Sequence, residues 1–235
     1  PMHFLDLADF SAETLRTLIA RGRTLKTQGR VAASADPACK DAVLAMIFEK
    51  PSTRTRLSFD VGMRRLGGST ITLNPQDLQL GRGETVEDAA RVLSRYVDVL
   101  VVRNSDHDAL RRLADAATIP VVNGLTNLTH PCQVMADVMT YEEHRGPIAG
   151  KTWAWTGDGN NVLHSMLEAS ARFGFNLRAA TPQGHGPLER YVNWAPVEGG
   201  SVTMMRDADG AVKNAACVLT DPWASMGMGE DAGGH

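Results

Sequence analysis

Short apolar runs alternate with amphipathic helical segments along the chain, and this alternation restricts the fold more than any other feature. Parallel strands need long crossover connections, usually helical, so the pattern predicts parallel sheets covered by helices. Strands are expected at residues 42–48, 69–74, 97–103, 119–124, 152–157, 176–182, 200–205 and 216–221. Helices are expected at residues 53–66, 85–97, 106–117, 130–146, 161–174, 187–195 and 207–214.

The predicted elements fall into two α/β sets, separated by the segment "PIAGK" that follows Gly146. Proline and glycine close together are typical of a hinge or a domain boundary. A chain of 235 residues is long enough for two modest domains. We therefore predict an α/β protein with two domains, residues 1–146 and 147–235, each with a parallel sheet flanked by helices.

The composition argues against several classes of protein. The formal net charge is −3 and no run is rich in lysine or arginine, so no nucleic-acid partner is expected. No apolar run approaches the length of a membrane span, and the N-terminus lacks a signal-peptide pattern, so we expect no membrane partner and a cytoplasmic protein. The three cysteines and the histidines lack ligand spacing, which predicts reduced thiols and no metal site.

Residues 48–68, "FEKPSTRTRLSFDVGMRRLGG", predict a turn that leads from a strand into a helix capped by Ser52. The free backbone N–H groups and the positive dipole end at a helix N-terminus attract anions, and Arg54, Arg56 and three hydroxyl groups add further donors. Phosphate fits such a site best. A capped helix with solvated arginines is an equally good interpretation of this segment alone.

Other polar residues follow the predicted strands at their carboxyl ends, where parallel sheets bind ligands. Arg103 closes one strand, His130 and Gln133 lie at the start of the long helix after another, and Asn160 and Asn161 lie in "GDGNN". Taken singly, each could be a surface charge, a helix cap or a turn residue. Taken together, they predict one ligand-binding edge.

A dinucleotide site is the obvious alternative, because "GDGNNV" contains Gly157 and Gly159 after a predicted strand. Val162 stands where the third small residue of the fingerprint should be, and the strand at residues 176–182 has no acidic residue to hold a ribose. The sequence therefore predicts no nucleotide cofactor.

Five segments resemble the ornithine branch of the aspartate/ornithine carbamoyltransferase family, in the family's order and across nearly the whole chain. They are "FEKPSTRTRLSFDVGMRRLGG", "DLQLGRGETVEDAARVLSRYVDVLVVR", "NGLTNLTHPCQVMADVMT", "TGDGNNVLHSMLEA" and "DPWASMG". The resemblance implies a carbamoyl-phosphate-binding first domain and an ornithine-binding second domain. It implies an enzyme that moves the carbamoyl group to the δ-amine of L-ornithine, giving L-citrulline and phosphate, with no cofactor.

The resemblance also implies the site residues. Those around carbamoyl phosphate are Ser52, Thr53, Arg54, Thr55, Gln79, Arg103, His130 and Gln133. Those around ornithine are Asn161, Asp221, Ser225 and Met226. Within the first set the serine, threonines and arginine of "STRT" hold the phosphate, and Arg103, His130 and Gln133 hold the carbamoyl group. Gln79 reaches the site of a neighbouring subunit, and "SMG" marks ornithine rather than aspartate as the acceptor.

The implied reaction explains these residue types. An uncharged amine attacks the carbonyl carbon, and a tetrahedral oxyanion forms before phosphate leaves. Preorganised donors must face that oxygen, and Arg103, His130 and Thr55 are expected to supply them as the catalytic residues. No nucleophilic side chain is needed, and no general base is assigned. Asp221 is expected to hold the α-amino group.

The resemblance further implies a homotrimer that acts in arginine biosynthesis. A putrescine or N-acetylornithine carbamoyltransferase remains an alternative, as does a non-catalytic fragment that binds carbamoyl phosphate. The family continues past the "SMG" loop to an "HCLP" segment and a final helix. Residues 147–235 are therefore expected to be only part of the ornithine domain, and this chain is expected to bind carbamoyl phosphate but to convert ornithine poorly.

Overall fold

The computed structural model describes residues 1–35, 39–74 and 83–222, with the backbone alone for residues 29–35. The chain divides into two compact units. The first consists of Pro1–Leu5 and Ala20–Thr126, and the second of Asp6–Ile19 and the described residues from Asn127 onward. The units differ from the predicted domains in where they divide, and the boundary near residue 146 stays a prediction.

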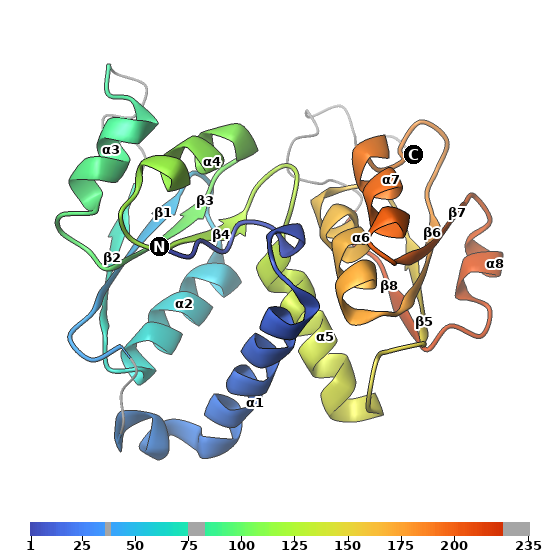
Figure 1. Cartoon of the computed structure of the whole chain (residues 1–235), viewed down its shortest axis with the longest axis horizontal. Helices are drawn as coiled ribbons and strands as arrows, with labels where there is room; N and C mark the ends of the chain where they lie inside the picture. Colours follow the sequence, from blue (N-terminus) through green and yellow to red (C-terminus); the bar gives the residue numbers. More distant parts are fainter. Residues whose placement is uncertain (36–38, 75–82, 223–235) are drawn as a thin grey trace. The chain divides into compact units, whose positions relative to one another are not determined.

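The first unit contains a four-stranded parallel sheet in the order β2-β1-β3-β4. Its strands are β1 (Val43–Phe48), β2 (Ser69–Leu73), β3 (Val99–Arg103) and β4 (Val121–Leu125). Its helices are α2 (Thr53–Arg65), α3 (Val86–Leu93) and α4 (His107–Ala116). Helices α3 and α4 cover one face and α2 covers the other (Figure 1). The predicted parallel sheet is therefore confirmed.

Alternating side chains of β1 build two cores, one on each face of this sheet. Ala45 and Ile47 pack with apolar residues of α3 and α4, whereas Leu44 and Met46 pack against Met63 of α2. Successive side chains of a strand point to opposite faces, so a strand between two helical layers must be apolar throughout. The uninterrupted run at residues 43–48 meets this requirement.

The N-terminal segment forms two helices that the sequence analysis missed. The short 3₁₀ helix η1 spans Leu7–Asp9, and α1 spans Ala12–Ala35. Helix α1 begins after Ser11, whose Oγ accepts from the backbone N–H of Thr14 at 3.1 Å, as an N-cap does. Leu15 and Ile19, one turn apart on α1, are the buried apolar residues that fix the first turns.

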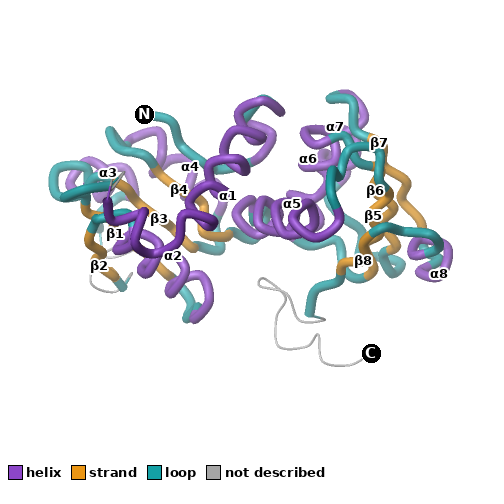
Figure 2. The backbone as a smooth tube through the Cα atoms, turned by 90° about the horizontal axis from the view of Figure 1, so that it is seen from below, coloured by secondary structure: helices purple, strands orange, loops and turns teal. Residues whose placement is uncertain are grey.

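The second unit contains another four-stranded parallel sheet, in the order β7-β6-β5-β8. Its strands are β5 (Thr152–Thr156), β6 (Asn176–Ala180), β7 (Ser201–Met205) and β8 (Cys217–Leu219). Its helices are α5 (Pro131–Arg145), α6 (Asn161–Phe173), α7 (Glu189–Val197) and α8 (Ala208–Val212). The tube view shows α6 and α7 on one side of the strands and α8 on the other (Figure 2). The predicted fold class, with two parallel sheets that are each flanked by helices, is thus confirmed.

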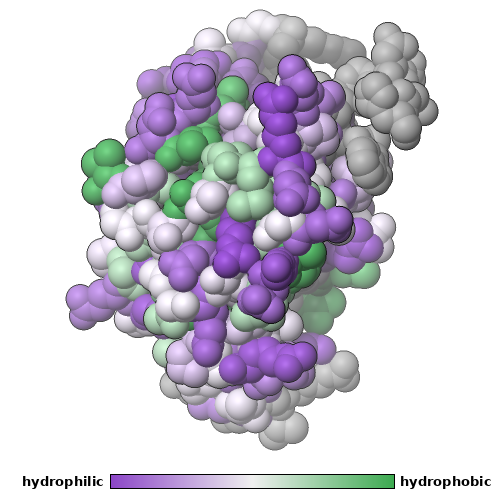
Figure 3. Space-filling view, turned by 90° about the vertical axis from the view of Figure 1, so that its right-hand side faces the viewer, coloured by the Kyte–Doolittle hydropathy of each residue, from purple (hydrophilic) through white to green (hydrophobic). Residues whose placement is uncertain are grey.

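Helix α6 is the central helix of the second unit. It is buried along most of its length, because it packs on the sheet and also contacts η1, α5 and α7. The helix ends at Gly174, whose φ of 70° is a left-handed cap conformation that glycine adopts without strain. By contrast, the surface in Figure 3 is largely hydrophilic, with apolar residues in small separate groups.

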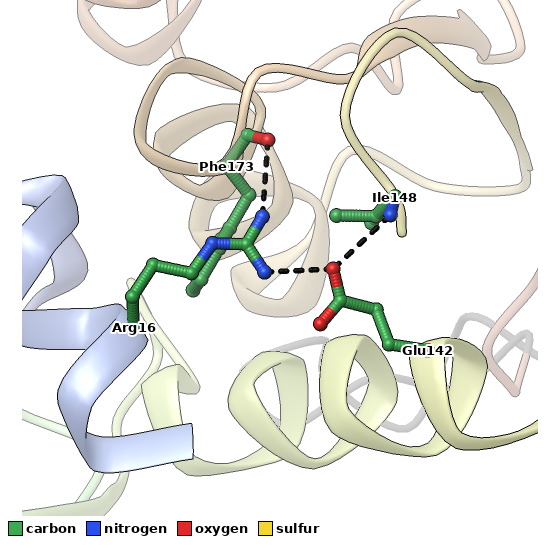
Figure 4. A network of polar contacts seen from close by, with 4 residues as sticks. All are labelled: Arg16, Glu142, Ile148 and Phe173. Carbon is green, nitrogen blue, oxygen red and sulfur yellow. Dashed lines mark hydrogen bonds and ion pairs between the residues drawn. The ribbon is translucent and has the colours of Figure 1, made fainter. Parts of the chain in front are cut away.

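A carboxylate on α5 joins three other segments of the second unit (Figure 4). Glu142 Oε1 accepts from Arg16 Nη1 at 2.7 Å and from the backbone N–H of Ile148 at 3.1 Å. The Arg16 guanidinium also lies 4.8 Å from the centre of the Phe173 ring. The side chain of Glu142 is only 6% exposed, whereas that of Arg16 is 38% exposed, so the carboxylate is shielded from water and the guanidinium is only partly so. The ion pair ties the start of α1 to α5 and α6.

Candidate active site

Arg103 forms the centre of the first unit's candidate site. It ends β3 at the carboxyl edge of the sheet, opposite Phe48 of β1. Its Nη1 donates to Ser52 Oγ at 3.0 Å and to Thr55 Oγ1 at 3.2 Å. Burial lowers the pKa of the Arg103 guanidinium from its usual value, and an arginine side chain stays protonated in proteins.

Ser52 is the N-cap of α2, as predicted, but its side chain does not cap the helix. Its backbone is extended, with φ −149° and ψ 108°, and its Oγ makes no capping hydrogen bond. The hydroxyl accepts from Arg103 instead. The first N–H groups of α2 thus keep their capacity to bind an anion, and Arg54 is exposed beside them.

Glu49 and Ser105, which the sequence analysis did not select, fix the backbone around Arg103. Glu49 Oε2 accepts from Ser105 N at 2.6 Å and from Ser105 Oγ at 2.7 Å. The backbone N–H of Glu49 donates to the Arg103 carbonyl at 2.9 Å. These bonds tie the residues that follow β1 to those that follow β3, so Arg103 leaves the sheet in a fixed direction.

His130 belongs to the second unit and is the N-cap of α5, with Pro131 at the first helical position. Its backbone N–H donates to Ser165 Oγ of α6 at 2.8 Å. One residue earlier, the Thr129 hydroxyl donates to Asp6 Oδ1 at 2.5 Å. The backbone at His130 is therefore held by α6, and the residue before it by the N-terminal segment.

His164, also on α6, holds the same loop from a second point. Its Nδ1 lies 2.8 Å from the Leu128 carbonyl, and its Nε2 lies 3.0 Å from the backbone nitrogen of Leu188. Because a backbone N–H can only donate to Nε2, the ring is neutral with its proton on Nδ1. Burial lowers the pKa of His164 to about 4, and the ring stacks on Tyr191 at 4.2 Å.

Two of the predicted ornithine residues, Asn161 and Asp221, lie at the carboxyl edge of the second sheet. Asn161 is the first residue of α6 and is 6% exposed. Its neighbour Asn160 caps α6 through Oδ1 and donates from Nδ2 to Asp221 Oδ2 at 2.6 Å. Burial raises the pKa of Asp221, while the bond from Asn160 opposes that rise. Asn160, which the sequence analysis treated only as a turn or edge residue, therefore orients the Asp221 carboxylate.

Gln133 brings a further carboxylate into this region. Its Nε2 donates to Asp137 Oδ1 at 2.9 Å, one turn later on α5. Burial is the main cause that raises the pKa of Asp137, and the negative charge of Asp221 raises it further. Asp137 therefore lies close to the Asp221 carboxylate, although the sequence analysis did not name it.

The structure brings together part of each predicted residue set. In the first unit it joins Ser52, Thr55 and Arg103, while Thr53 and Arg54 lie exposed on the first turn of α2. In the second unit Gln133 bonds to Asp137, and Asp221 accepts from Asn160 next to Asn161. Assembly of the two sets around one ligand stays a prediction. Gln79, Ser225 and Met226 lie outside the described residues.

Among the described residues, no group of three histidine, cysteine or acidic side chains could hold a metal ion. Cys39, Cys132 and Cys217 form no disulfide with one another. In the same part of the chain, no helix combines the length and the hydropathy that crossing a membrane requires.

The fold and the site together define a class of protein. Donors gathered at a helix N-terminus, beside the carboxyl ends of parallel strands, are typical of α/β proteins that bind phosphorylated small molecules. Two family models then match nearly the whole chain. Residues 2–143 match the aspartate/ornithine carbamoyltransferase carbamoyl-phosphate-binding domain, and residues 149–233 match the aspartate/ornithine-binding domain. The chain belongs to the aspartate/ornithine carbamoyltransferase family.

Individual relatives and solved structures agree with this assignment. An ornithine carbamoyltransferase of Agrobacterium fabrum is 55% identical over 237 residues, which cover 100% of this chain and 77% of the relative. The ornithine carbamoyltransferase of Rhizobium meliloti is 54% identical, over 99% of this chain and 77% of that relative. The ornithine carbamoyltransferase structure from Pyrococcus furiosus matches with a TM-score of 0.90 and 45% identity, over 98% of this chain and 75% of that one. The structure of an anabolic ornithine carbamoyltransferase from Campylobacter jejuni matches with a TM-score of 0.88 and 35% identity. The match covers 97% of this chain and 75% of that one.

Proposed function

We propose that this protein transfers the carbamoyl group of carbamoyl phosphate to the δ-amine of L-ornithine, giving L-citrulline and phosphate. The observation that carries the proposal is the Arg103 guanidinium, bonded to Ser52 and Thr55 at the N-terminus of α2. This arrangement gathers a cation, two hydroxyls and free helix N–H groups at one point. Its family membership and its relatives, named as ornithine carbamoyltransferases, support the choice of substrates.

The phosphate group binds at the start of α2. The side chains of Ser52, Thr53, Arg54 and Thr55 surround it, and the N–H groups of the first turn point toward it. A guanidinium presents a planar pair of donors that matches two phosphate oxygens, so Arg54 contributes most to phosphate recognition. Gln79, from a neighbouring subunit, completes this part of the site.

Catalysis depends on stabilising the oxyanion that forms when the amine attacks the carbonyl carbon. Arg103, His130 and Thr55 donate to that oxygen, and the phosphate then leaves with the electrons of the broken C–O bond. Donors fixed before the reaction lower the barrier because they need no reorganisation. The bonds from Arg103 to Ser52 and Thr55 support such preorganisation.

The second unit supplies the acceptor. Asp221 holds the α-ammonium group of ornithine, and Asn161, Ser225 and Met226 complete the contacts. The hydrogen bond from Asn160 supports this role, because it fixes one oxygen of the Asp221 carboxylate. Putrescine has no α-carboxylate, and N-acetylornithine has no free α-ammonium group, so both should bind this edge less well.

The active form is a cytoplasmic homotrimer that serves arginine biosynthesis. Leu57 is 55% exposed and Val61 is 38% exposed, and the two lie one turn apart on the outer face of α2. An apolar stripe of this kind, next to a site that needs a neighbour's Gln79, supports contact between copies of the chain. Sedimentation velocity would measure the oligomeric state.

The proposal is tested by measuring citrulline formation from carbamoyl phosphate and ornithine with the purified chain. Replacing Arg103 by Gln should lower kcat by about 10²–10³, the usual effect of removing one oxyanion donor. Arg91→Gln is the matched control, because Arg91 is exposed on α3 and pairs only locally with Asp88 in the described structure.

Parallel assays with putrescine and N-acetylornithine test the acceptor. A faster reaction with either amine would overturn the choice of ornithine. Binding of carbamoyl phosphate without transfer to any of the three amines would support a non-catalytic protein instead.

A further inference from the structure

The amide of Gln133 is held in one orientation by Asp137. The two side chains are four residues apart on α5 and therefore lie on the same face of the helix. Gln133 Nε2 lies 2.9 Å from Asp137 Oδ1. An ionised carboxylate has no hydrogen to donate, so the amide nitrogen and not the amide oxygen must face it. The carbonyl oxygen of Gln133 is thereby directed away from Asp137.

We propose that Asp137 is a positioning residue that acts through Gln133 and makes the site select carbamoyl phosphate over phosphate. This inference rests on the proposed function and on the family resemblance, which implies that Gln133 holds the carbamoyl group. A carbamoyl group carries two N–H donors, which need an acceptor. The fixed carbonyl oxygen of Gln133 is such an acceptor, whereas the arginines of the site can only donate. Inorganic phosphate lacks these N–H groups, so its binding does not depend on the orientation of the amide.

The surroundings of Asp137 indicate more than a solvated charge on a helix surface. Its carboxyl group is half-buried, and its pKa is raised by burial and by the nearby charge of Asp221. The pKa of Cys217, at the start of β8, is raised by burial and also by the charge of Asp137. A carboxylate kept close to another carboxylate costs free energy, and the bond from Gln133 offsets part of that cost.

The test is calorimetric titration of carbamoyl phosphate and of inorganic phosphate into variants of the whole chain. Asp137→Leu should lower the affinity for carbamoyl phosphate about three- to tenfold, the range expected for loss of one ordinary hydrogen bond. Asp137→Asn should lower this affinity only about twofold, because one of the two orientations of an asparagine amide still accepts from Gln133. Affinity for phosphate should change less than about twofold in either variant.

A double-mutant cycle separates positioning from a structural role. Once Gln133 is replaced by Ala, the further change Asp137→Leu should no longer weaken carbamoyl phosphate. Glu143→Gln serves as the control, because it removes an exposed carboxylate from the same helix. Thermal melting of each variant would show whether it folds.

Three results would overturn the inference: equal loss of affinity for both anions, additive effects in the cycle, or a larger effect of Asn than of Leu at position 137. If the unmodified chain bound phosphate but no carbamoyl phosphate, the proposed function itself would fail. The two failures can therefore be distinguished.

Discussion

Glu168 is a buried carboxyl group whose pKa is strongly raised. It lies on α6, is 3% exposed, and accepts from the backbone N–H groups of Leu7 at 2.9 Å and Ala8 at 3.3 Å. Burial, and then the charge of Asp6, raises the pKa of Glu168 to about 8. The folded protein therefore favours the neutral acid at a pH where the unfolded chain has already lost this proton.

This shift predicts how stability changes with pH. A carboxyl group whose pKa is raised on folding stabilises most below its unfolded pKa of 4.5, and that contribution is lost as the pH rises toward about 8. Glu168→Gln removes the titration but keeps an oxygen for the two N–H groups. The variant should therefore gain stability relative to the original protein as the pH is raised from 4.5 to 8. Urea unfolding at several pH values measures the difference, and a constant difference would contradict the prediction.

His164 contributes with the opposite sign. Its pKa is lowered from 6.5 to about 4, so its contribution is present above pH 6.5 and is lost as the pH falls toward 4. The Glu168→Gln variant lacks the opposing contribution of Glu168. In this variant, the contribution of His164 to the free energy of unfolding should therefore rise as the pH increases from 4 to 6.5.

Some site residues could be predicted from the sequence and others could not. Ser52 and Arg103 belong to local patterns, a helix start and a strand end, whose positions follow from chain order. By contrast, Glu49 accepts a hydrogen bond from Ser105, 56 positions along the chain, and Ser165 accepts one from His130, 35 positions away. Such contacts depend on strand order and helix packing, which no local pattern specifies.

At the scale of elements, α6 anchors the loop that carries His130. The hydroxyl of Ser165 accepts the His130 backbone N–H, and Ser165 is fully buried. Removing a buried acceptor leaves that N–H unpaired and costs about 1–3 kcal/mol. The same bond fixes the direction in which α5 begins.

Ser165→Ala should therefore lower the free energy of unfolding by about 1–3 kcal/mol and should lower kcat. Ser170→Ala is the control, because Ser170 is equally buried on α6 but its hydroxyl bonds only to the Leu167 carbonyl within the same helix. Chemical denaturation and the citrulline assay measure the two effects. An equal loss of kcat in both variants would show that packing of α6, and not the bond to His130, is responsible.

The positions of most elements were predicted, apart from one helix that ends early and the two N-terminal helices, which were missed. The helix predicted at residues 85–97 ends at Leu93, because the Ser94 hydroxyl bonds back to the Ala90 carbonyl and a turn follows. Helix α1 was missed because it has few apolar residues and contains glycines, so its periodicity is weak. Its first turns are stabilised by contacts such as Arg16 with Glu142, which only the folded structure reveals.

For the whole molecule, the arrangement of the sites predicts ordered binding. The donors proposed to meet carbamoyl phosphate in the first unit are already joined by the bonds of Arg103 to Ser52 and Thr55. The sequence analysis instead expects the ornithine contacts on loops of the second domain, and loops are the usual parts of a site that close last. Carbamoyl phosphate should therefore bind before ornithine, and citrulline should leave before phosphate.

Product inhibition measures this order. Phosphate should compete with carbamoyl phosphate, and citrulline should not. Competition by citrulline against carbamoyl phosphate, without competition by phosphate, would reverse the prediction.

The alternation of strands and helices was enough to predict two parallel sheets, because parallel strands need long connections that are usually helical. It could not predict that residues 6–19 join the second unit, since this grouping depends on contacts across more than half of the chain.

This return of the N-terminal segment has a consequence during protein synthesis. Leu7 leaves the ribosome 161 residues before Glu168, the carboxyl group that accepts its N–H, and Arg16 leaves 126 residues before Glu142. The first unit is complete in the nascent chain at Thr126, before α5 and α6 have been made. Residues 6–19 cannot make these contacts until α5 and α6 have been synthesised. Until then, a chaperone that binds short amphipathic segments would find a target in this part of the nascent chain.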